Sequence, residues 1–309
     1  GPACYGQGGR HATLTDANLS LGYLDPDFFL GGEMSLDQAS ARDAIDRSVG
    51  DPLELPHERA AWGIHEIIDE DVARAFRIHA SERGFDYRHS TMIAFGGSGP
   101  VHAMGVAQKL GIPRVIFPFA AGVMSALGLL ASPLTFEVAR TRQVFVDQVD
   151  AGDFEQTFKS LEEEARAPLN RAVGEEEVTI LRRLDMRYHG QGHEIEVEVP
   201  AGGGQESLPE LFRETYAAVY GAALLDTPLV ITTWKVEAAL PTPSLLTVPP
   251  VADRKAVKKG TRLAYFDAGF VETPIYDRYQ LAVDTVISGP ALIEERESTV
   301  VIGPGDRAQ

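Results

Sequence analysis

Apolar side chains recur at helical spacing in three long stretches of the chain. Between residues 56 and 83 they return every three to four positions, which predicts an amphipathic helix that ends at Gly84. A second such helix, rich in acidic residues, is expected around 154–169, and a third over 207–220. These three segments are the most regular in the sequence.

Between the first two helices the period changes, and short apolar runs are followed by small residues. Residues 90–95 read as a strand, 96–100 as a tight glycine-rich loop and 101–110 as a helix. A second strand at 114–119 then leads through another glycine-containing turn to a helical segment at 126–131. This order of strand, loop and helix, repeated once, predicts an α/β layer with a parallel sheet.

The rest of the chain favours strands. They are expected over 136–146, 178–186, 194–199 and 229–240. A stretch with four prolines at 241–250 reads as a linker, and 255–302 is rich in short β runs. We therefore expect three parts: 1–135, an α+β region at 136–245, and a small β-rich region at 246–309.

Charge and cysteine content exclude several classes of protein. The 28 basic and 45 acidic residues give a net charge of −17, which argues against nucleic acid or an anionic membrane as a partner. The lone Cys4 allows no intramolecular disulfide and no cysteine-based zinc site, so we expect a cytoplasmic protein. The mainly apolar run 117–134 is broken by prolines and glycines, and we expect neither a membrane span nor a signal peptide.

The glycine loop is the strongest candidate for binding chemistry. Gly96, Gly97, Ser98 and Gly99 stand between a predicted strand and a predicted helix. Backbone N–H groups in such a loop can approach a ligand closely, and a helix N-terminus favours an anion or a polar ring edge. The loop has neither the Walker A pattern nor the dinucleotide fingerprint, and a tight turn without a ligand is the alternative. His102 opens the helix, where it is either a polar support or an acid–base group.

Other polar residues are open to two interpretations. Asp16 is either a helix cap, together with Thr15, or a catalytic carboxylate. His189 and His193 have the spacing of a metal-binding pair on a helix, but they flank a glycine-rich turn between strands, so we predict no metal site there. His65 lies on the long helix and is expected to be a packing or surface group.

Several strings in this sequence resemble the hydantoinase A/oxoprolinase family. They are Gly-Pro-Ala-Cys-Tyr-Gly at 1–6, Thr-Asp-Ala-Asn-Leu at 15–19, Leu-Asp-Pro at 24–26, Phe-Gly-Gly-Ser-Gly-Pro-Val-His-Ala at 95–103, Gly-Val-Met-Ser-Ala-Leu-Gly at 122–128, Tyr-x-Gly-Gln at 188–191, and Gly-Pro-Ala-Leu-Ile-Glu at 289–294 with Ser298 and Thr299. The likeness covers nearly the whole chain, in the family's order.

The family comprises ATP-dependent enzymes: 5-oxoprolinases, N-methylhydantoinases, and related subunits of acetone and acetophenone carboxylases. The resemblance implies an α/β chain in which 1–135 is the C-terminal part of an actin/sugar kinase/Hsp70-like ATPase domain, that is, half of that nucleotide-binding fold. It also implies that Gly96, Gly97, Ser98 and Gly99, with His102, lie on the adenosine side of a site for ATP and Mg²⁺. Asp16 is the residue that we expect to be catalytic.

One difference from the family is large. Its phosphate-binding loops carry Asp-x-Gly-Gly-Thr strings before the Gly-Pro-Ala-Cys-Tyr-Gly motif, and this sequence has none. The chain therefore resembles the C-terminal half of an A subunit, whose partners are the upstream half and a hydantoinase B-type subunit. The leading expectation is a part of a cyclic-amide hydrolase. The alternatives are a ketone carboxylase subunit and a non-catalytic fragment that docks the B-type partner.

Overall fold

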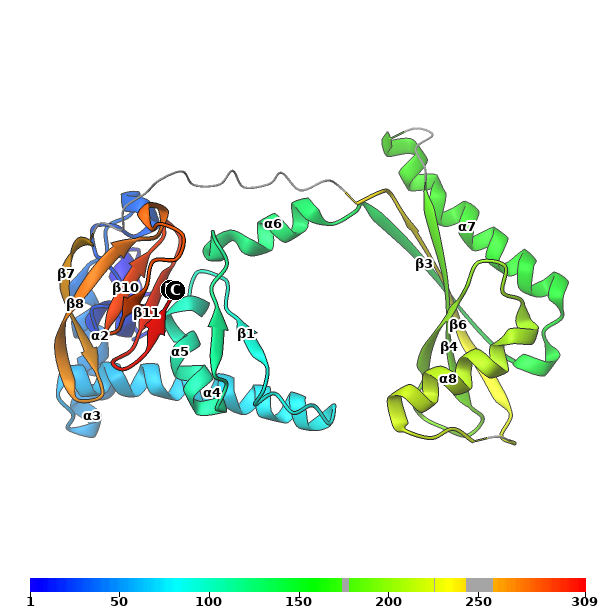
Figure 1. The fold of residues 1–309 in the computed structure, drawn as a ribbon, viewed down its shortest axis with the longest axis horizontal. Coiled ribbons are helices and arrows are strands. Elements are labelled where there is room, and N and C mark those ends of the chain that lie inside the picture. Colours follow the sequence, from blue (N-terminus) through cyan, green and yellow to red (C-terminus); the bar gives the residue numbers. More distant parts are fainter. Residues whose placement is uncertain (174–177, 225, 243–257) are drawn as a thin grey trace. The chain divides into compact units, whose positions relative to one another are not determined.

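The computed structural model describes residues 1–173, 178–224, 226–242 and 258–309. The chain folds into two compact units (Figure 1). The first unit combines Gly1–Gly128 with Thr247–Gln309, and the second is Leu129–Leu246. Both are mixtures of helices and strands, so the chain is mixed α/β, as the sequence predicts. The expected division into three parts stays a prediction.

Helices make up most of the N-terminal part of unit 1. They are α1 (Leu14–Ser20), α2 (Gln38–Ile45), α3 (Asp51–Leu53), α4 (His57–Glu82), α5 (Gly99–Leu110) and α6 (Met124–Ala131), the last of which runs into unit 2. Helix α4 confirms the helix expected over 56–83, and the following Gly84 has a positive φ of 63°. Its buried side includes two polar residues, His65 and Asp69.

A strand–helix–strand unit positions the glycine loop. Strands β1 (Thr91–Ile93) and β2 (Arg114–Ile116) pair in parallel, and α5 connects them. This confirms the parallel pairing predicted from the sequence. Apolar side chains of α5 pack with Met92 and Val115 on one face of the two strands. On the other face, Ile93 and Ile116 stand side by side in register and are about half exposed.

The C-terminal strands complete unit 1. A sheet has the order β11 (Thr299–Ile302), β10 (Ala291–Glu294), β8 (Gly269–Asp277), β7 (Lys258–Phe266), while β9 (Ile287–Ser288) pairs with β12 (Arg307–Ala308). Strand β10 runs parallel to β8, and the other pairs are antiparallel. Leu292 of this sheet and Ile45 of α2 belong to one buried core, and the Tyr23 hydroxyl donates to the Tyr265 carbonyl over 2.6 Å. The two ends of the sequence therefore share one core.

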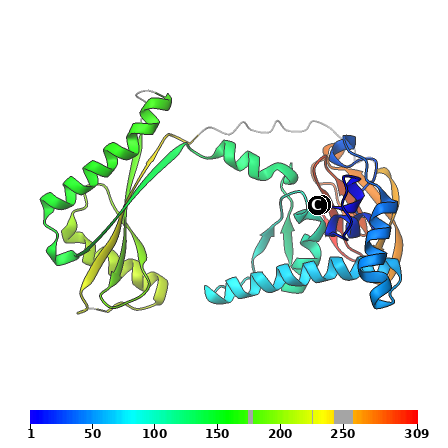
Figure 2. The same ribbon diagram turned by 180° about the vertical axis from the view of Figure 1, so that it is seen from behind.

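Unit 2 is an antiparallel sheet with helices on one face. Its strand order is β3 (Thr135–Phe145), β6 (Leu229–Ala239), β4 (Thr179–Tyr188), β5 (Ile195–Val199). Helices α7 (Ala151–Val173) and α8 (Leu208–Tyr220) pack on the apolar face around the buried Trp234 (Figure 2). The other face carries ion pairs such as Lys235 with Asp185, at 2.8 Å. The helices and strands expected in this half of the chain are confirmed.

Some expectations are settled only in part. Most of the predicted linker at 241–250 lies outside the described residues. The β runs expected over 255–302 are confirmed from Lys258 onward. None of the helices in the described parts of the chain is long and apolar enough to cross a bilayer.

Candidate functional site

The glycine loop joins β1 to α5 and is fixed by a contact with the segment that follows β2. Gly96 has a φ of 93°, a conformation that side chains rarely adopt, and its N–H donates to the Ala121 carbonyl over 2.8 Å. Helix α5 begins at Gly99, and Pro100 follows in its first turn. The Ser98 side chain makes no capping hydrogen bond, so the first N–H groups of the helix are not used by it.

A cavity of about 410 Å³ opens beside this loop. Its lining is almost entirely apolar and comes from α1, α4, β1 and α5: Leu14, Ile68, Val72, Met92, Ile93, Ala94, Phe95, Ala103 and Val106, with Ser98, Gly99 and His102 as the polar or small members. The volume lies within the range of small-molecule sites. Of the four predicted loop residues, Ser98 and Gly99 line the cavity, whereas Gly96 and Gly97 do not.

A third loop, at 295–298, closes against both glycine segments. The buried Glu295 carboxylate accepts a hydrogen bond from the Ala121 N–H over 3.0 Å and lies 3.2 Å from the Ser298 hydroxyl. Burial raises the pKa of Glu295, although Arg278 and these hydrogen bonds oppose the shift. A Cβ added at Gly122 would lie 2.5 Å from Glu297. Gly122 is therefore needed for this close approach of two loops.

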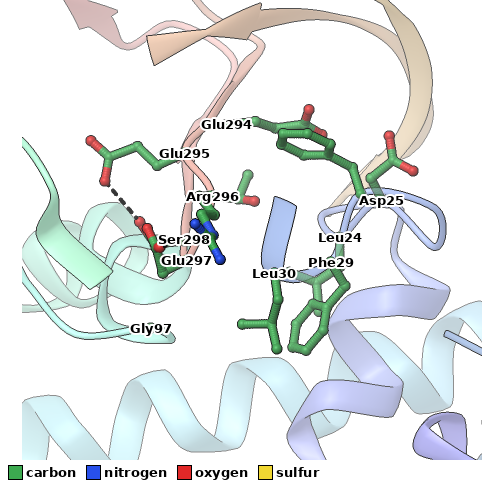
Figure 3. A pocket seen from close by; sticks show the side chains of 12 residues that line it. Leu24, Asp25, Phe29, Leu30, Gly97, Glu294, Glu295, Arg296, Glu297 and Ser298 are labelled. Atoms are coloured by element: carbon green, nitrogen blue, oxygen red, sulfur yellow. Dashed lines mark hydrogen bonds and ion pairs between the residues drawn. The ribbon is translucent and has the colours of Figure 1, made fainter. Parts of the chain in front are cut away.

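Figure 3 shows the small pocket where this third loop faces the Leu24–Asp25 segment and Gly97. Glu294, a buried residue that also lines this pocket, pairs with Lys259 at 2.6 Å and with Arg262 at 2.9 Å. The pocket has a volume of about 40 Å³, which suffices for a few water molecules but not for a nucleotide. Its lining brings together three of the strings that resemble the family, those at 24–26, 95–103 and 289–299. The pocket is therefore a structural junction and is too small for a nucleotide.

Asp16 lies inside α1 rather than at its cap. The cap is Thr13, and Asp16, the third residue of the helix, completes a capping box with it, which corrects the expectation that Thr15 and Asp16 cap the helix. The fully buried carboxylate accepts hydrogen bonds from the N–H groups of Cys4 (2.7 Å), Ala3 (3.2 Å) and Thr13 (2.9 Å), and from the Thr13 hydroxyl (2.7 Å). Burial would raise the pKa of Asp16, but these donors outweigh it and lower the pKa. Its catalytic role stays a prediction.

Cys4 shares this environment and is buried. Burial raises the pKa of its thiol, and the neighbouring Asp16 raises it further. The sulfur is thus held as a thiol rather than as a nucleophilic thiolate.

Behind the glycine loop, four buried side chains from three helices meet. The Asn18 amide lies 3.1 Å from His102 Nε2, and His102 Nδ1 lies 2.7 Å from Asp69 Oδ1. His65 Nδ1 lies 2.8 Å from Asn18 Oδ1, and its Nε2 faces Asp69 Oδ2 at 3.5 Å. The imidazole rings stack with their centroids 4.3 Å apart. We call these four residues the polar ring.

Electrostatics inside the polar ring favour neutral groups. Burial, followed by the influence of His102 and Lys109, lowers the pKa of His65 to about 3. Burial raises the pKa of Asp69, and the hydrogen bond from His102 offsets only part of that shift. Sequence reasoning missed Asn18 and Asp69 in this role, because their partners lie 84 and 33 positions away.

The polar ring is also the place where described residues could hold a metal ion. Donor atoms of His65, Asp69 and His102 lie within 4.8 Å of one another. However, both His102 nitrogens and His65 Nδ1 already make hydrogen bonds, so only His65 Nε2 and Asp69 Oδ2 remain available. Two free donor atoms are fewer than a protein metal site normally supplies.

His189 and His193 do not join such a group among the described residues. They flank the turn between β4 and β5, as the sequence predicts, and the His189 ring contacts Phe145 with centroids 5.2 Å apart.

Comparisons with known proteins place these features in a wider group. The family model described as hydantoinase/oxoprolinase matches residues 1–138, and the model of the hydantoinase/oxoprolinase C-terminal domain matches 146–309. An uncharacterized protein of Methanocaldococcus jannaschii is 35% identical over 98% of this chain and 44% of its own length. Caprolactamase subunit alpha of Pseudomonas jessenii is 32% identical over 99% of this chain and 46% of its own length.

Two solved structures are similar in fold across 99% of this chain. A nucleotide-free acetone carboxylase structure gives a TM-score of 0.78 at 27% identity, and the ATP-dependent caprolactamase of Pseudomonas jessenii gives 0.72 at 30% identity. The chain covers 46% of each of these structures, and it spans about half the length of the caprolactamase and acetone carboxylase subunits it matches. The family models together cover almost all of its residues, and the chain belongs to the hydantoinase/oxoprolinase family.

Proposed function

We propose that this chain is part of an ATP-dependent enzyme that opens cyclic amides. The observation that carries the proposal is its similarity, over nearly its full length, to caprolactamase subunit alpha and to the structure of that ATP-dependent enzyme. The 5-oxoprolinase of Dictyostelium discoideum, another enzyme named for a cyclic amide, is 27% identical over the whole of this chain and 26% of its own length. Bound ATP, accompanied by Mg²⁺, would supply a phosphoryl group to the amide oxygen and thereby activate the carbonyl carbon toward water.

The nucleotide site in this proposal is the glycine loop. Gly97, Ser98 and Gly99 contact the adenosine end through backbone N–H groups, and the adjoining apolar cavity receives the base. Gly96 shapes the loop on the adenosine side, because its own N–H donates to the Ala121 carbonyl. His102 supports the loop from behind, because both of its ring nitrogens are used within the polar ring. This assignment corresponds to half of an actin/sugar kinase/Hsp70-like nucleotide-binding fold at residues 1–135.

The open face of β1 and β2 supports the proposal that a further segment completes the site. Parallel strands are normally covered on both faces, yet Ile93 and Ile116 are exposed by 58% and 47%. Phe95 and Phe119, in the loops that follow the two strands, are exposed by 50% and 43%. We assign this face to the segment that corresponds to the unmatched half of the relatives. A hydantoinase B-type subunit is the second proposed partner.

Reconstitution tests the activity. The chain is combined with that additional segment and a B-type subunit, and ADP release is measured with hydantoins, 5-oxoproline and caprolactam. We expect ADP release that is coupled to ring opening of at least one of them. Absence of coupling across the panel would contradict the proposal.

A ketone carboxylase subunit is the second candidate, since the acetone carboxylase structure gives the higher TM-score of the two solved structures. ATP consumption that depends on bicarbonate and a ketone, with no response to cyclic amides, would favour it. A non-catalytic docking fragment would bind the B-type subunit in size-exclusion chromatography but would show no nucleotide binding in calorimetry of the assembled protein.

The nucleotide assignment has its own test at Gly97. A Cβ at this position would meet only the Glu297 carbonyl oxygen, at an ordinary 3.5 Å, so Gly97→Ala is expected to fold normally. Gly97→Val places two further methyl groups on the loop surface and is expected to weaken ATP binding about tenfold or more in the assembled enzyme, measured by calorimetry. Equal affinities of the Ala and Val variants would place the nucleotide elsewhere.

A further inference from the structure

The polar ring has four contacts, and each of them requires one donated proton. The Asn18 amide supplies one donor and one acceptor to its two neighbours, and each neutral imidazole does the same. An ionised Asp69 supplies acceptors to both of its neighbours. The ring then has three donors for four contacts, and turning the Asn18 amide over only reverses the direction of the bonds. One further proton is needed to close the ring.

The missing donor coincides with the longest contact. Three of the four contacts measure 2.7–3.1 Å, whereas His65 Nε2 and Asp69 Oδ2 are 3.5 Å apart. Asp69 Oδ2 is buried and has no hydrogen-bond partner. Because Asp69 is completely inaccessible to solvent, bulk water does not supply one. A proton on either atom closes the ring, and in both cases the four side chains are neutral in sum.

Neighbouring charges do not supply this neutrality. Tyr23 packs against His65 with ring centroids 5.2 Å apart, and it is uncharged at ordinary pH. The charged groups that act on the ring are Glu66 of α4 and Lys109 of α5, and these two pair with each other at 2.9 Å. Without the extra proton, the ring would carry an uncompensated buried negative charge, which is costly.

We propose that Asn18, His65, Asp69 and His102 retain one shared proton and act together as a neutral ring that positions the first turn of α5. His102 is the fourth residue of α5, so the ring holds the end of the glycine loop against α1 and α4. The side chains of Asn18, His65 and Asp69 are thus positioning residues. This inference goes beyond the proposed function and requires no nucleotide.

The variant Asp69→Asn distinguishes a ring that keeps the extra proton from a ring in which Asp69 is ionised. An amide, like a protonated carboxyl, offers one acceptor to His102 and one donor to His65. Asp69→Ala leaves two buried imidazole nitrogens without partners, which is expected to raise the unfolding equilibrium constant about a hundredfold or more. At pH 7 the Asn variant is expected to unfold no more readily than the wild type.

The pH dependence gives a second readout. The native ring keeps a proton that Asp69 of the unfolded chain releases above about pH 4, so rising pH destabilises the wild type. We therefore compare the unfolding equilibrium constant of the wild type with that of Asp69→Asn. The ratio of the first constant to the second is expected to rise by up to tenfold per pH unit between pH 5 and 8, until the native ring itself releases the proton. Asp71→Asn makes the same charge change on the exposed side of α4, where Asp71 pairs with Arg74, and its ratio to the wild type is expected to stay flat.

Urea unfolding of the full chain measures these constants. Trp62 stacks on His65 with centroids 5.6 Å apart, and Trp234→Phe in every protein leaves Trp62 as the fluorescent reporter. Hydrogen–deuterium exchange over residues 97–103 is expected to rise in Asp69→Ala and to stay near the wild type in Asp69→Asn. The proposal is overturned if Asn destabilises as much as Ala, if the pH ratio is flat, or if elemental analysis finds one equivalent of zinc or manganese that Asp69→Asn loses.

Discussion

Asp16 and Asp69 are both fully buried aspartates, but their surroundings have opposite effects on them. Asp16 accepts four hydrogen bonds, and its pKa is lowered despite burial. Asp69 has one oxygen without a hydrogen bond, and burial raises its pKa. The number of donors around a carboxylate, rather than its burial, decides which form the fold stabilises.

The same substitution is therefore expected to have opposite results at the two positions. In Asp16→Asn one of the two carboxylate oxygens is replaced by an NH₂ group. Because both oxygens accept hydrogen bonds from backbone N–H groups, the new NH₂ group faces at least one donor. We expect the free energy of unfolding at pH 7 to fall by about 2–4 kcal/mol. Because the native pKa of Asp16 is lowered, the wild-type advantage is complete above the ordinary pKa near 4 and is lost as the pH falls below it. Urea titrations at several pH values measure this, and an Asn variant as stable as the wild type would contradict it.

A small residue in α5 makes room for Asp69. A Cβ at Gly105 would lie 2.1 Å from Asp69 Oδ2, so Gly105→Ala is expected to lower the free energy of unfolding by about 1–3 kcal/mol. Gly63→Ala in α4 is the matched control, since a Cβ there meets nothing within 4 Å. It is expected to stabilise the chain by about 0.5–1 kcal/mol through helix propensity. Thermal unfolding measures both variants. Equal changes in the free energy of unfolding would show that the Asp69 side chain can move aside without cost.

At the scale of elements, the sequence predicts periodic segments well and isolated contacts poorly. Helix α4 and the β1–loop–α5–β2 order follow from apolar spacing and glycines, which are local properties of the chain. The sequence predicts the cap of α1 at Thr15 and Asp16 rather than at Thr13, because Thr13 and Thr15 are equally good caps and only the capping box distinguishes them. The polar ring depends on side chains that approach across three helices, and no local pattern records such contacts.

The open face of β1 and β2 gives a prediction at this scale. Ile93→Glu with Ile116→Glu changes two side chains that the chain alone leaves about half exposed, but it also places two like charges side by side in register. The free energy of unfolding of the chain alone is therefore expected to fall by no more than about 1 kcal/mol. Binding of the additional segment is expected to weaken by about a hundredfold or more, because two charges would be buried against it. Leu263→Glu, on an exposed position of β7, is the control that should leave binding unchanged. Calorimetry with the separately produced segment measures this.

At the scale of the whole molecule, the two units differ in continuity. Unit 2 is one stretch of sequence with its own core around Trp234, whereas unit 1 is assembled from both ends of the chain. The Leu21 carbonyl, at the end of α1, accepts a hydrogen bond from the Tyr265 N–H over 2.8 Å, and Arg262 donates to the Gly22 carbonyl over 2.7 Å. These contacts tie the first helices to the last strands.

Truncation tests the expected three-part division. Residues 1–135 produced alone lose the side chains of Ala264, Leu292 and Val301 from the core, so we expect no cooperative unfolding transition. Residues 129–246 keep their core and are expected to unfold cooperatively, as followed by Trp234 fluorescence. A cooperative transition in the first fragment would show that 1–135 is an independent domain.

The discontinuity of unit 1 also sets an order of events during synthesis. Arg262 and its partner Gly22 are separated by 240 positions, so at about 5–20 residues per second a ribosome needs roughly 12–48 s to join them. During that interval the apolar sides of α1 and α4 have been made but their covering strands have not, while unit 2 can already fold. The nascent chain therefore exposes the apolar sides of these helices at a stage when unit 2 can already be folded, and we expect its folding to benefit from chaperones at that stage.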